Sequence, residues 1–206
     1  MAIATTTRPV VLERASQGFV DATAEPPFLY ELTPPEARKV LDDVQAEPVD
    51  KLRVDERWIT VPADVGEVRV RIVRPPDVTG TLPAILYMHG GGWVLGNAHT
   101  HDRLVRELAA GTGAAIAFPA YSLSPEARYP TAIEENFTVA RWIVSDGAQH
   151  GLDVTRFAVA GDSVGGNMAA VLAIMAKQRG GVPMTGPGRR PAHAGRTRVR
   201  RPPPAV

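Results

Sequence analysis

Apolar residues in the second quarter of the chain and beyond follow patterns that predict β-strands. In residues 67–73, valine and isoleucine alternate with two arginines, as in a half-solvated antiparallel strand, and residues 57–61 predict a strand before it. Residues 84–88, 114–118 and 157–160 are continuously apolar instead. Such runs are expected for strands that are buried on both faces of a sheet.

Helical patterns separate and follow these buried strands. Residues 102–110 and 167–178 predict helices, and a longer helix is expected to begin with a capping box made by Thr131 and Glu134. Strands that alternate with helices imply an α/β fold. We therefore expect a mostly parallel sheet with helices on both faces.

The first 50 residues carry weaker patterns. Residues 1–32 show little periodicity and are expected to run over the surface or to form part of a lid. Residues 33–36, Thr-Pro-Pro-Glu, match a capping box with proline at the first helical position. The apolar residues of that helix are expected to share one face: Val40, Leu41 and Val44. We assign residues 1–50 to a cap or lid and residues 51–184 to a partial α/β domain.

Charge is distributed unevenly along the 206 residues. The net charge is +1, but residues 185–206 contain six arginines and no acid, which leaves −5 on residues 1–184. An acidic body argues against nucleic acid as a partner. The basic tail, residues 185–206, also has five prolines and three glycines, so it buries too little apolar surface to order and is expected to be disordered.

Cysteine is absent, which excludes disulfides and thiolate metal sites and fits a reducing compartment. The N-terminus shows no signal-peptide pattern, and the longest apolar run, residues 168–176, is too short to cross a bilayer. The sequence predicts a cytoplasmic protein without stable membrane insertion. The histidines lack a supporting ligand pattern, so no metal site is expected.

Two glycine-rich motifs carry the candidate chemistry. Residues 161–165, Gly-Asp-Ser-Val-Gly, lie between a predicted strand and a helix, as in a nucleophile elbow with Ser163 as the nucleophile. Residues 89–93, His-Gly-Gly-Gly-Trp, follow an earlier buried strand and are typical of an oxyanion loop. The expected oxyanion donors are the backbone N–H groups of Gly91, Gly92 and Val164. Either motif alone fits a glycine-rich turn, but the pair favours a functional site.

These motifs, together with Thr100-His101-Asp102 and the segment Tyr-Ser-Leu-Ser-Pro-Glu at 121–126, resemble the hormone-sensitive-lipase-like branch of the α/β-hydrolases. The resemblance spans about residues 55–184. It implies an α/β-hydrolase fold with an N-terminal helical cap, hydrolysis of small carboxylic esters and no cofactor. It also implies that His89 and Gly90 support the oxyanion loop. Ser122 and Ser124 depart from the family pattern, and we expect those changes to affect packing near the site.

The family needs an acid and then a histidine after the nucleophile, and this sequence lacks that pattern. No Asp or Glu follows Asp162, and the one later histidine, His193, lies in the basic tail. The C-terminal strands and helices that carry the acid and base in the family are missing. A shifted reading frame, or a truncated gene model, beginning near Gly186 is our hypothesis for this abrupt change. The sequence thus predicts an impaired catalytic triad.

Other polar residues near the motifs are weak candidates to replace the missing acid and histidine of the catalytic triad. His99 and His101 are expected to cap a helix or face solvent, and His150 to lie on the surface at the far end of its strand. The Asp162 side chain is expected to point away from Ser163, and Glu126 to anchor its own loop.

Three functions remain open at this point. The chain is an esterase, a non-catalytic ligand-binding relative similar to the plant gibberellin receptors, or an interaction protein that uses its basic tail. The sequence does not specify an oligomeric state.

Overall fold

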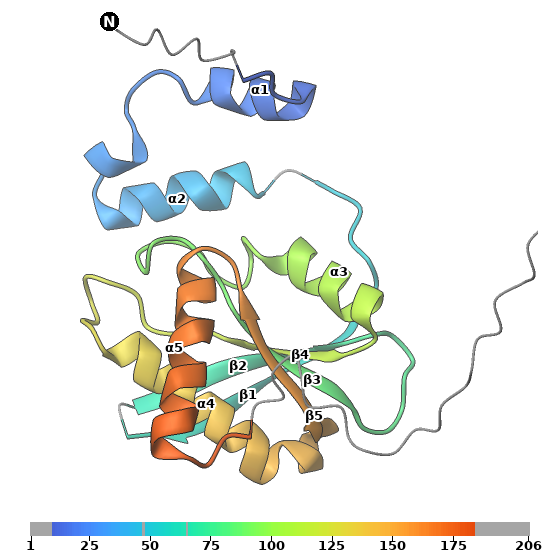
Figure 1. Cartoon of the computed structure of the whole chain (residues 1–206). Coiled ribbons are helices and arrows are strands. Elements are labelled where there is room, and N and C mark those ends of the chain that lie inside the picture. Colours follow the sequence, from blue (N-terminus) through green and yellow to red (C-terminus); the bar gives the residue numbers. More distant parts are fainter. Residues whose placement is uncertain (1–9, 47, 65, 184–206) are drawn as a thin grey trace, which may run out of the picture.

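The computed structural model describes residues 10–46, 48–64 and 66–183 (Figure 1). The predicted disorder of residues 185–206, together with His193, lies outside the described residues.

A five-stranded sheet forms the centre of the molecule, in the order β1-β2-β4-β3-β5. Its strands are β1 (Asp55–Ala63), β2 (Gly66–Arg74), β3 (Leu82–Met88), β4 (Ala115–Pro119) and β5 (Leu152–Gly161). The pairs β1–β2 and β2–β4 are antiparallel, whereas β3 is parallel to both β4 and β5. The parallel part therefore contains the strands that lead into both glycine-rich motifs.

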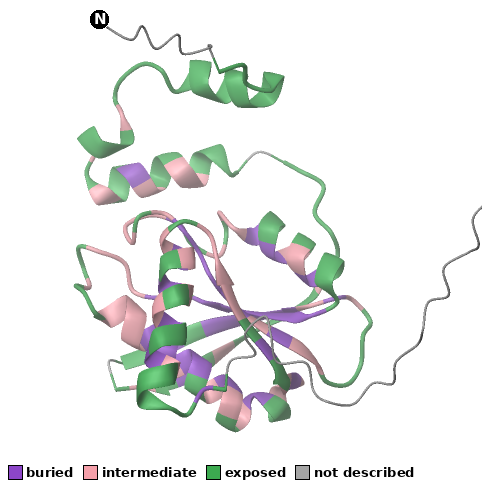
Figure 2. Cartoon of the chain, in the orientation of Figure 1, coloured by how far each residue is buried: buried purple, intermediate pink, exposed green. Residues whose placement is uncertain are grey.

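Helices cover both faces of this sheet, as predicted for an α/β fold. Helix α3 (Asp102–Thr112) lies on one face, and α4 (Thr131–Asp146) and α5 (Val164–Arg179) lie on the other (Figure 1). Successive residues of β2 show the alternation: Ile72 belongs to the core under α4 and α5, and Val73 to the core under α3. Buried residues line both faces of the sheet (Figure 2).

Three short elements precede the sheet: α1 (Arg14–Ala22), the 3-10 helix η1 (Leu29–Glu31) and α2 (Pro34–Val44). The sequence analysis did not predict helix α1. The helix has only nine residues, and none of them is buried. The side chain of Glu13 starts it by accepting hydrogen bonds from the N–H groups of Ala15 and Ser16.

Helix α2 begins as predicted but presents a different face. The capping box is present, since Glu36 accepts hydrogen bonds from both the N–H and the hydroxyl of Thr33. The expected apolar face is wrong: Val40 and Val44 are exposed, and the buried residue is Ala37. The helix therefore packs on the body through a face that is partly apolar and partly polar, because its contacts include hydrogen bonds of Arg38 and Asp42.

The capping box predicted at Thr131 is wrong as well. Thr131 is the first residue of α4, so Pro130 holds the N-cap position and no side chain caps the helix. Glu134 forms a bidentate ion pair with Arg179 of α5 instead. The short helix η2 (Gly147–His150) then links α4 to β5.

Helix α5 ends at Arg179, and Gly180 follows with a positive φ of 73°, a conformation that glycine adopts readily after the last turn of a helix. Helices α4 and α5 have 16 residues each. Within the three described ranges, no helix has both the length and the apolar content that crossing a membrane requires.

Candidate active site

Ser163 lies on a sharp turn between β5 and α5. Its φ of 51° and ψ of −119° are unusual for a residue with a side chain, and such a conformation costs about 1–3 kcal/mol. The strand–turn–helix context predicted from the sequence is present, and the Ser163 side chain is exposed. Surrounding structure must hold this turn in place.

The turn is held by close backbone packing against the end of β3. A Cβ atom on Gly165 would overlap the carbonyl group of Met88, and one on Gly161 would overlap both that carbonyl oxygen and Gly165. Glycine at both positions thus lets α5 approach β3 backbone to backbone. The two motifs of the sequence meet at this contact, because Met88 directly precedes the second one.

Residues 89–98, here called the glycine loop, leave β3 and fold back on themselves. The carbonyl oxygen of Gly91 accepts hydrogen bonds from the N–H groups of Val94 (3.1 Å) and Leu95 (2.8 Å). Gly91 has a φ of 111°, and a Cβ there would overlap the Leu95 carbonyl. Among the hydrogen bonds of the described residues, none uses the N–H groups of Gly91, Gly92 or Val164.

His89 is buried at the base of the glycine loop, with 1% of its surface exposed. Its Nδ1 lies 2.7 Å from the Gly90 carbonyl oxygen, so Nδ1 carries the proton and donates it. The ring stacks on Tyr121, whose hydroxyl donates to the His89 carbonyl at 2.8 Å. Burial lowers the pKa of His89 to about 4, so the imidazole is neutral at pH 7.

Asp162 forms hydrogen bonds that the sequence analysis did not predict. Its Oδ1 accepts hydrogen bonds from the Gly90 N–H (3.0 Å) and the Tyr87 hydroxyl (2.8 Å). The pKa of Tyr87 is raised, mainly by burial of its hydroxyl and secondly by its hydrogen bond to Asp162. Asp162 therefore ties the turn that carries Ser163 to the glycine loop. These partners lie 72 and 75 residues away in the sequence, beyond the reach of any local pattern.

The expectations for the histidines upstream of Ser163 have mixed outcomes. His99 is exposed, as expected. His101 occupies the N-cap position of α3, yet its side chain makes no capping bond. Its Nε2 lies 3.7 Å from Asp162 Oδ1 instead, beside the buried His89. His150 was expected on the surface but is half-buried, with its ring 5.0 Å from that of Trp142.

The segment 121–126 is anchored by two carboxylates. Glu135, buried in α4, accepts hydrogen bonds from the N–H and the hydroxyl of Ser122, both at 2.6 Å. Glu126 was expected to anchor its own loop, but its carboxylate pairs with Arg38 of α2. That pairing lowers the pKa of Glu126 to about 2. Ser122 is thus held by hydrogen bonds to Glu135, a partner that the sequence analysis did not single out.

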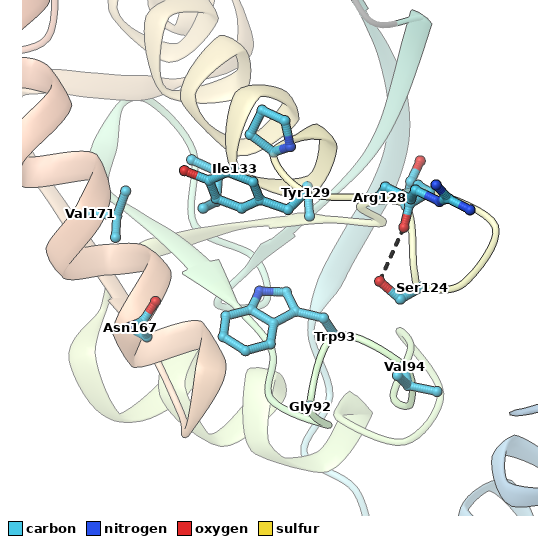
Figure 3. Close-up of a pocket in the computed structure, with 13 residues that line it drawn as sticks. Gly92, Trp93, Val94, Ser124, Arg128, Tyr129, Ile133, Asn167 and Val171 are labelled. Atoms are coloured by element: carbon cyan, nitrogen blue, oxygen red, sulfur yellow. Dashed lines mark hydrogen bonds between the residues drawn. The ribbon is translucent and has the colours of Figure 1, made fainter.

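A cavity of about 490 Å³ opens beside the turn and the glycine loop. Figure 3 shows the indole of Trp93 facing Tyr129 and Ile133 on one side and helix α5, with Asn167 and Val171, on the other. The Asn167 N–H donates to the Ser163 carbonyl at 3.1 Å, so the cavity begins one helical turn from Ser163. Its lining comes from three segments: Gly92, Trp93, Val94, Ser122, Ser124, Ala127, Arg128, Tyr129, Pro130, Ala132, Ile133, Asn167 and Val171.

Neither a metal site nor a hydrogen-bond partner for the Ser163 hydroxyl occurs in residues 10–46, 48–64 and 66–183. In these ranges, no three His, Asp or Glu side chains are grouped to hold a metal ion. Over the same ranges, the Ser163 hydroxyl forms no hydrogen bond, and the Nδ1 atoms of His89 and His101 lie next to the Gly90 carbonyl and the Thr100 hydroxyl instead.

The chain resembles known hydrolases in sequence and structure. A profile of the alpha/beta hydrolase fold matches residues 85–193. The carboxylesterase NlhH of Mycobacterium tuberculosis is 41% identical over 150 residues, which are 72% of this chain and 47% of the relative. The esterase LipI of the same organism is 43% identical over 150 residues, 71% of this chain and 46% of the relative. The chain thus spans about half the length of these curated relatives.

Solved structures give the same result for the fold. A thermostable esterase from Pseudomonas putida superposes with a TM-score of 0.78 at 40% identity, over 86% of this chain and 57% of that one. A fungal esterase from Rhizomucor miehei superposes with a TM-score of 0.78 at 36% identity, over 84% and 55% of the two chains. The resemblance read from residues 55–184 is confirmed: this chain belongs to the α/β-hydrolase fold family.

Proposed function

We propose that this chain carries the nucleophile and the oxyanion hole of a carboxylic ester hydrolase. The observation that supports it most is the backbone of Ser163, held at a φ of 51° beside three N–H groups that form no hydrogen bond among the described residues: those of Gly91 and Gly92 in the glycine loop and that of Val164. A strained turn and unsatisfied donors both cost free energy, and their combination is useful where an oxyanion forms. The named relatives are esterases and carboxylesterases, which fits the same chemistry.

The proposed reaction is acyl transfer through Ser163. The Ser163 Oγ attacks the ester carbonyl carbon and loses its proton, while the carbonyl π electrons move onto the oxygen. The N–H groups of Gly91, Gly92 and Val164 stabilise that oxyanion, and each such donor is worth about 3 kcal/mol in the transition state. Collapse expels the alcohol, which takes up a proton, and water then releases the acid and restores the serine.

The rate of this reaction depends on which group accepts the proton of the Ser163 hydroxyl. The Ser163 hydroxyl is exposed and has no hydrogen-bond partner among the described residues. We therefore propose that solvent takes the proton in the 206-residue chain. Its hydrolysis should then be slow, at about 10³-fold over the uncatalysed reaction, because no described side chain takes the proton from Ser163.

A second candidate function is ligand binding without turnover. It is favoured by the same exposed Ser163 hydroxyl, which has no hydrogen-bond partner within the part of the chain that the structure describes, together with the 490 Å³ cavity one helical turn away. In this case the cavity would hold a small ester or acid and leave it intact.

Hydrolysis of p-nitrophenyl acetate and butyrate distinguishes the two functions. A hydrolase should release p-nitrophenol faster than buffer alone, and the Ser163→Ala variant should lose that excess. Ser145→Ala, on the exposed end of α4, serves as the matched control because it removes a hydroxyl that lies away from the cavity. Equal rates for the wild type and the Ser163→Ala variant would remove Ser163 from the reaction.

A further inference from the structure

Helix α2 is attached to the body mainly by polar contacts. Ala37 is buried, while Arg38, Leu41 and Asp42 are half-buried on the same side of the helix. Residues three and four apart share a helix face, so Arg38 and Asp42 point to the same neighbouring surface. That surface is formed by the glycine loop and by the wall of the cavity.

Arg38 donates hydrogen bonds to both of these segments. Its Nε donates to the Val94 carbonyl at 2.7 Å, and its Nη2 donates to the Ser124 carbonyl at 2.8 Å. The two terminal nitrogens also bind the two carboxylate oxygens of Glu126, each at 2.8 Å. A planar guanidinium can satisfy these acceptors together, which a lysine cannot do. Val94 and Ser124 both line the cavity.

Two further bonds complete the connection. The side-chain amide of Asn97 donates to Asp42 at 2.8 Å, one turn along α2 from Arg38. The Ser124 N–H donates to the Trp93 carbonyl at 2.7 Å and so joins the glycine loop to the cavity wall directly. Arg38 therefore lies where α2, the glycine loop and the cavity wall meet.

The glycine loop needs such a support. Gly91, Gly92 and Gly96 all have a positive φ, and glycine loses more conformational freedom on ordering than any other residue. The proposed donors Gly91 and Gly92 must stay about 3 Å from the developing oxyanion. Because Val94 is bonded both to Gly91 and to Arg38, a movement of Arg38 is transmitted to the donors through one short segment.

We propose that Arg38 is a positioning residue, which fixes the glycine loop and the cavity wall to α2 so that the oxyanion donors stay aligned. This inference rests on the proposed function for its catalytic consequence. Its structural consequence stands apart, because the mobility of the loop can be measured without any substrate.

Hydrogen exchange of the full chain tests the structural part. The Arg38→Gln variant loses the ion pair and at least one carbonyl contact, so exchange in peptides covering residues 90–98 should accelerate about tenfold. Lys39→Gln is the matched control, since Lys39 pairs only with Asp43 among the described residues, on the exposed side of α2. Exchange in β4 serves as the internal reference for general destabilisation. Unchanged exchange at 90–98, or an equal acceleration in β4, overturns the proposal.

Kinetics test the positioning part. With p-nitrophenyl butyrate, Arg38→Gln should lower kcat about tenfold while KM changes less, because the loop acts on the transition state. The Arg38→Lys variant keeps the charge but loses the planar guanidinium, so its kcat should lie between those of the wild type and Arg38→Gln. An equal kcat in wild type and Arg38→Gln overturns the positioning role. If the wild type hydrolyses nothing, the proposed function fails, while the exchange result still decides whether Arg38 holds the loop.

Should Arg38→Gln fail to fold, Glu126→Gln replaces it. This variant leaves the Val94 and Ser124 contacts available and removes the charge that orients the guanidinium. It should accelerate exchange at 90–98 by a smaller factor than Arg38→Gln would, but by more than the Lys39→Gln control. Exchange equal to that of the control overturns the proposal.

Discussion

Asp162 gives the sharpest prediction, because one carboxylate oxygen holds two partners on different segments. In the Asp162→Ala variant the Gly90 N–H and the Tyr87 hydroxyl both lose their acceptor. A hydrogen bond to a charged group contributes about 1.5–3 kcal/mol. The Asp162 side chain is 44% exposed, so water replaces part of each bond. We therefore expect the free energy of unfolding to fall by about 2 kcal/mol in total.

Urea denaturation at pH 7 measures this change, with the midpoint and slope fitted separately. Asp162→Asn keeps the shape and one acceptor oxygen, so it should cost about half as much. Asp43→Ala, on the exposed side of α2, is the control and should change stability by less than about 0.5 kcal/mol. If Asp162→Ala unfolds with the same free energy as the Asp43→Ala control, Asp162 does not tie the turn to the glycine loop.

Two further predictions concern the same region. Gly165→Ala should lower the free energy of unfolding by about 3 kcal/mol or yield insoluble protein, because the new methyl group overlaps the Met88 carbonyl; an unchanged urea midpoint would contradict the backbone packing described above. His89 should make stability depend on pH. Its pKa is lowered to about 4 in the folded chain, so the unfolded chain, with a pKa of about 6.5, binds more protons between these values. Stability present at pH 7 is therefore lost as the pH falls, by about 2 kcal/mol at pH 5 from this group. Urea midpoints at pH 7 and pH 5 check it, and equal midpoints would show that His89 is not buried as a neutral ring.

Local patterns in the sequence predicted the sheet and its helices well. Continuous apolar runs at 84–88 and 157–160 do form β3 and β5. The expected burial on both faces holds for most of β3, which lies between two strands, but it is wrong for β5, which is the edge strand of the described sheet and exposes Ala158. The capping box at Thr33 is also correct, since all its atoms lie within four residues. The one at Thr131 is wrong because the same residue types occur there one position inside the helix.

Long-range contacts could not be predicted in this way. Arg38 and Asp162 each look like ordinary surface residues in the sequence, and their partners lie between 56 and 88 positions away. Helix α1 was missed because it has only nine residues, of which Phe19 and Val20 are the only large apolar ones, and both face solvent instead of packing on the body. Only the fold brings the glycine loop, the turn at Ser163 and helix α2 together.

Mass spectrometry after reaction with p-nitrophenyl butyrate tests the role of Ser163 most directly, because it detects the acyl group on the serine itself. We expect a butyryl group on the peptide that contains Ser163 in the wild type, and none on that peptide in the Ser163→Ala variant. A peptide that remains unmodified in the wild type, with butyryl groups found only on lysines, would contradict Ser163 as the nucleophile.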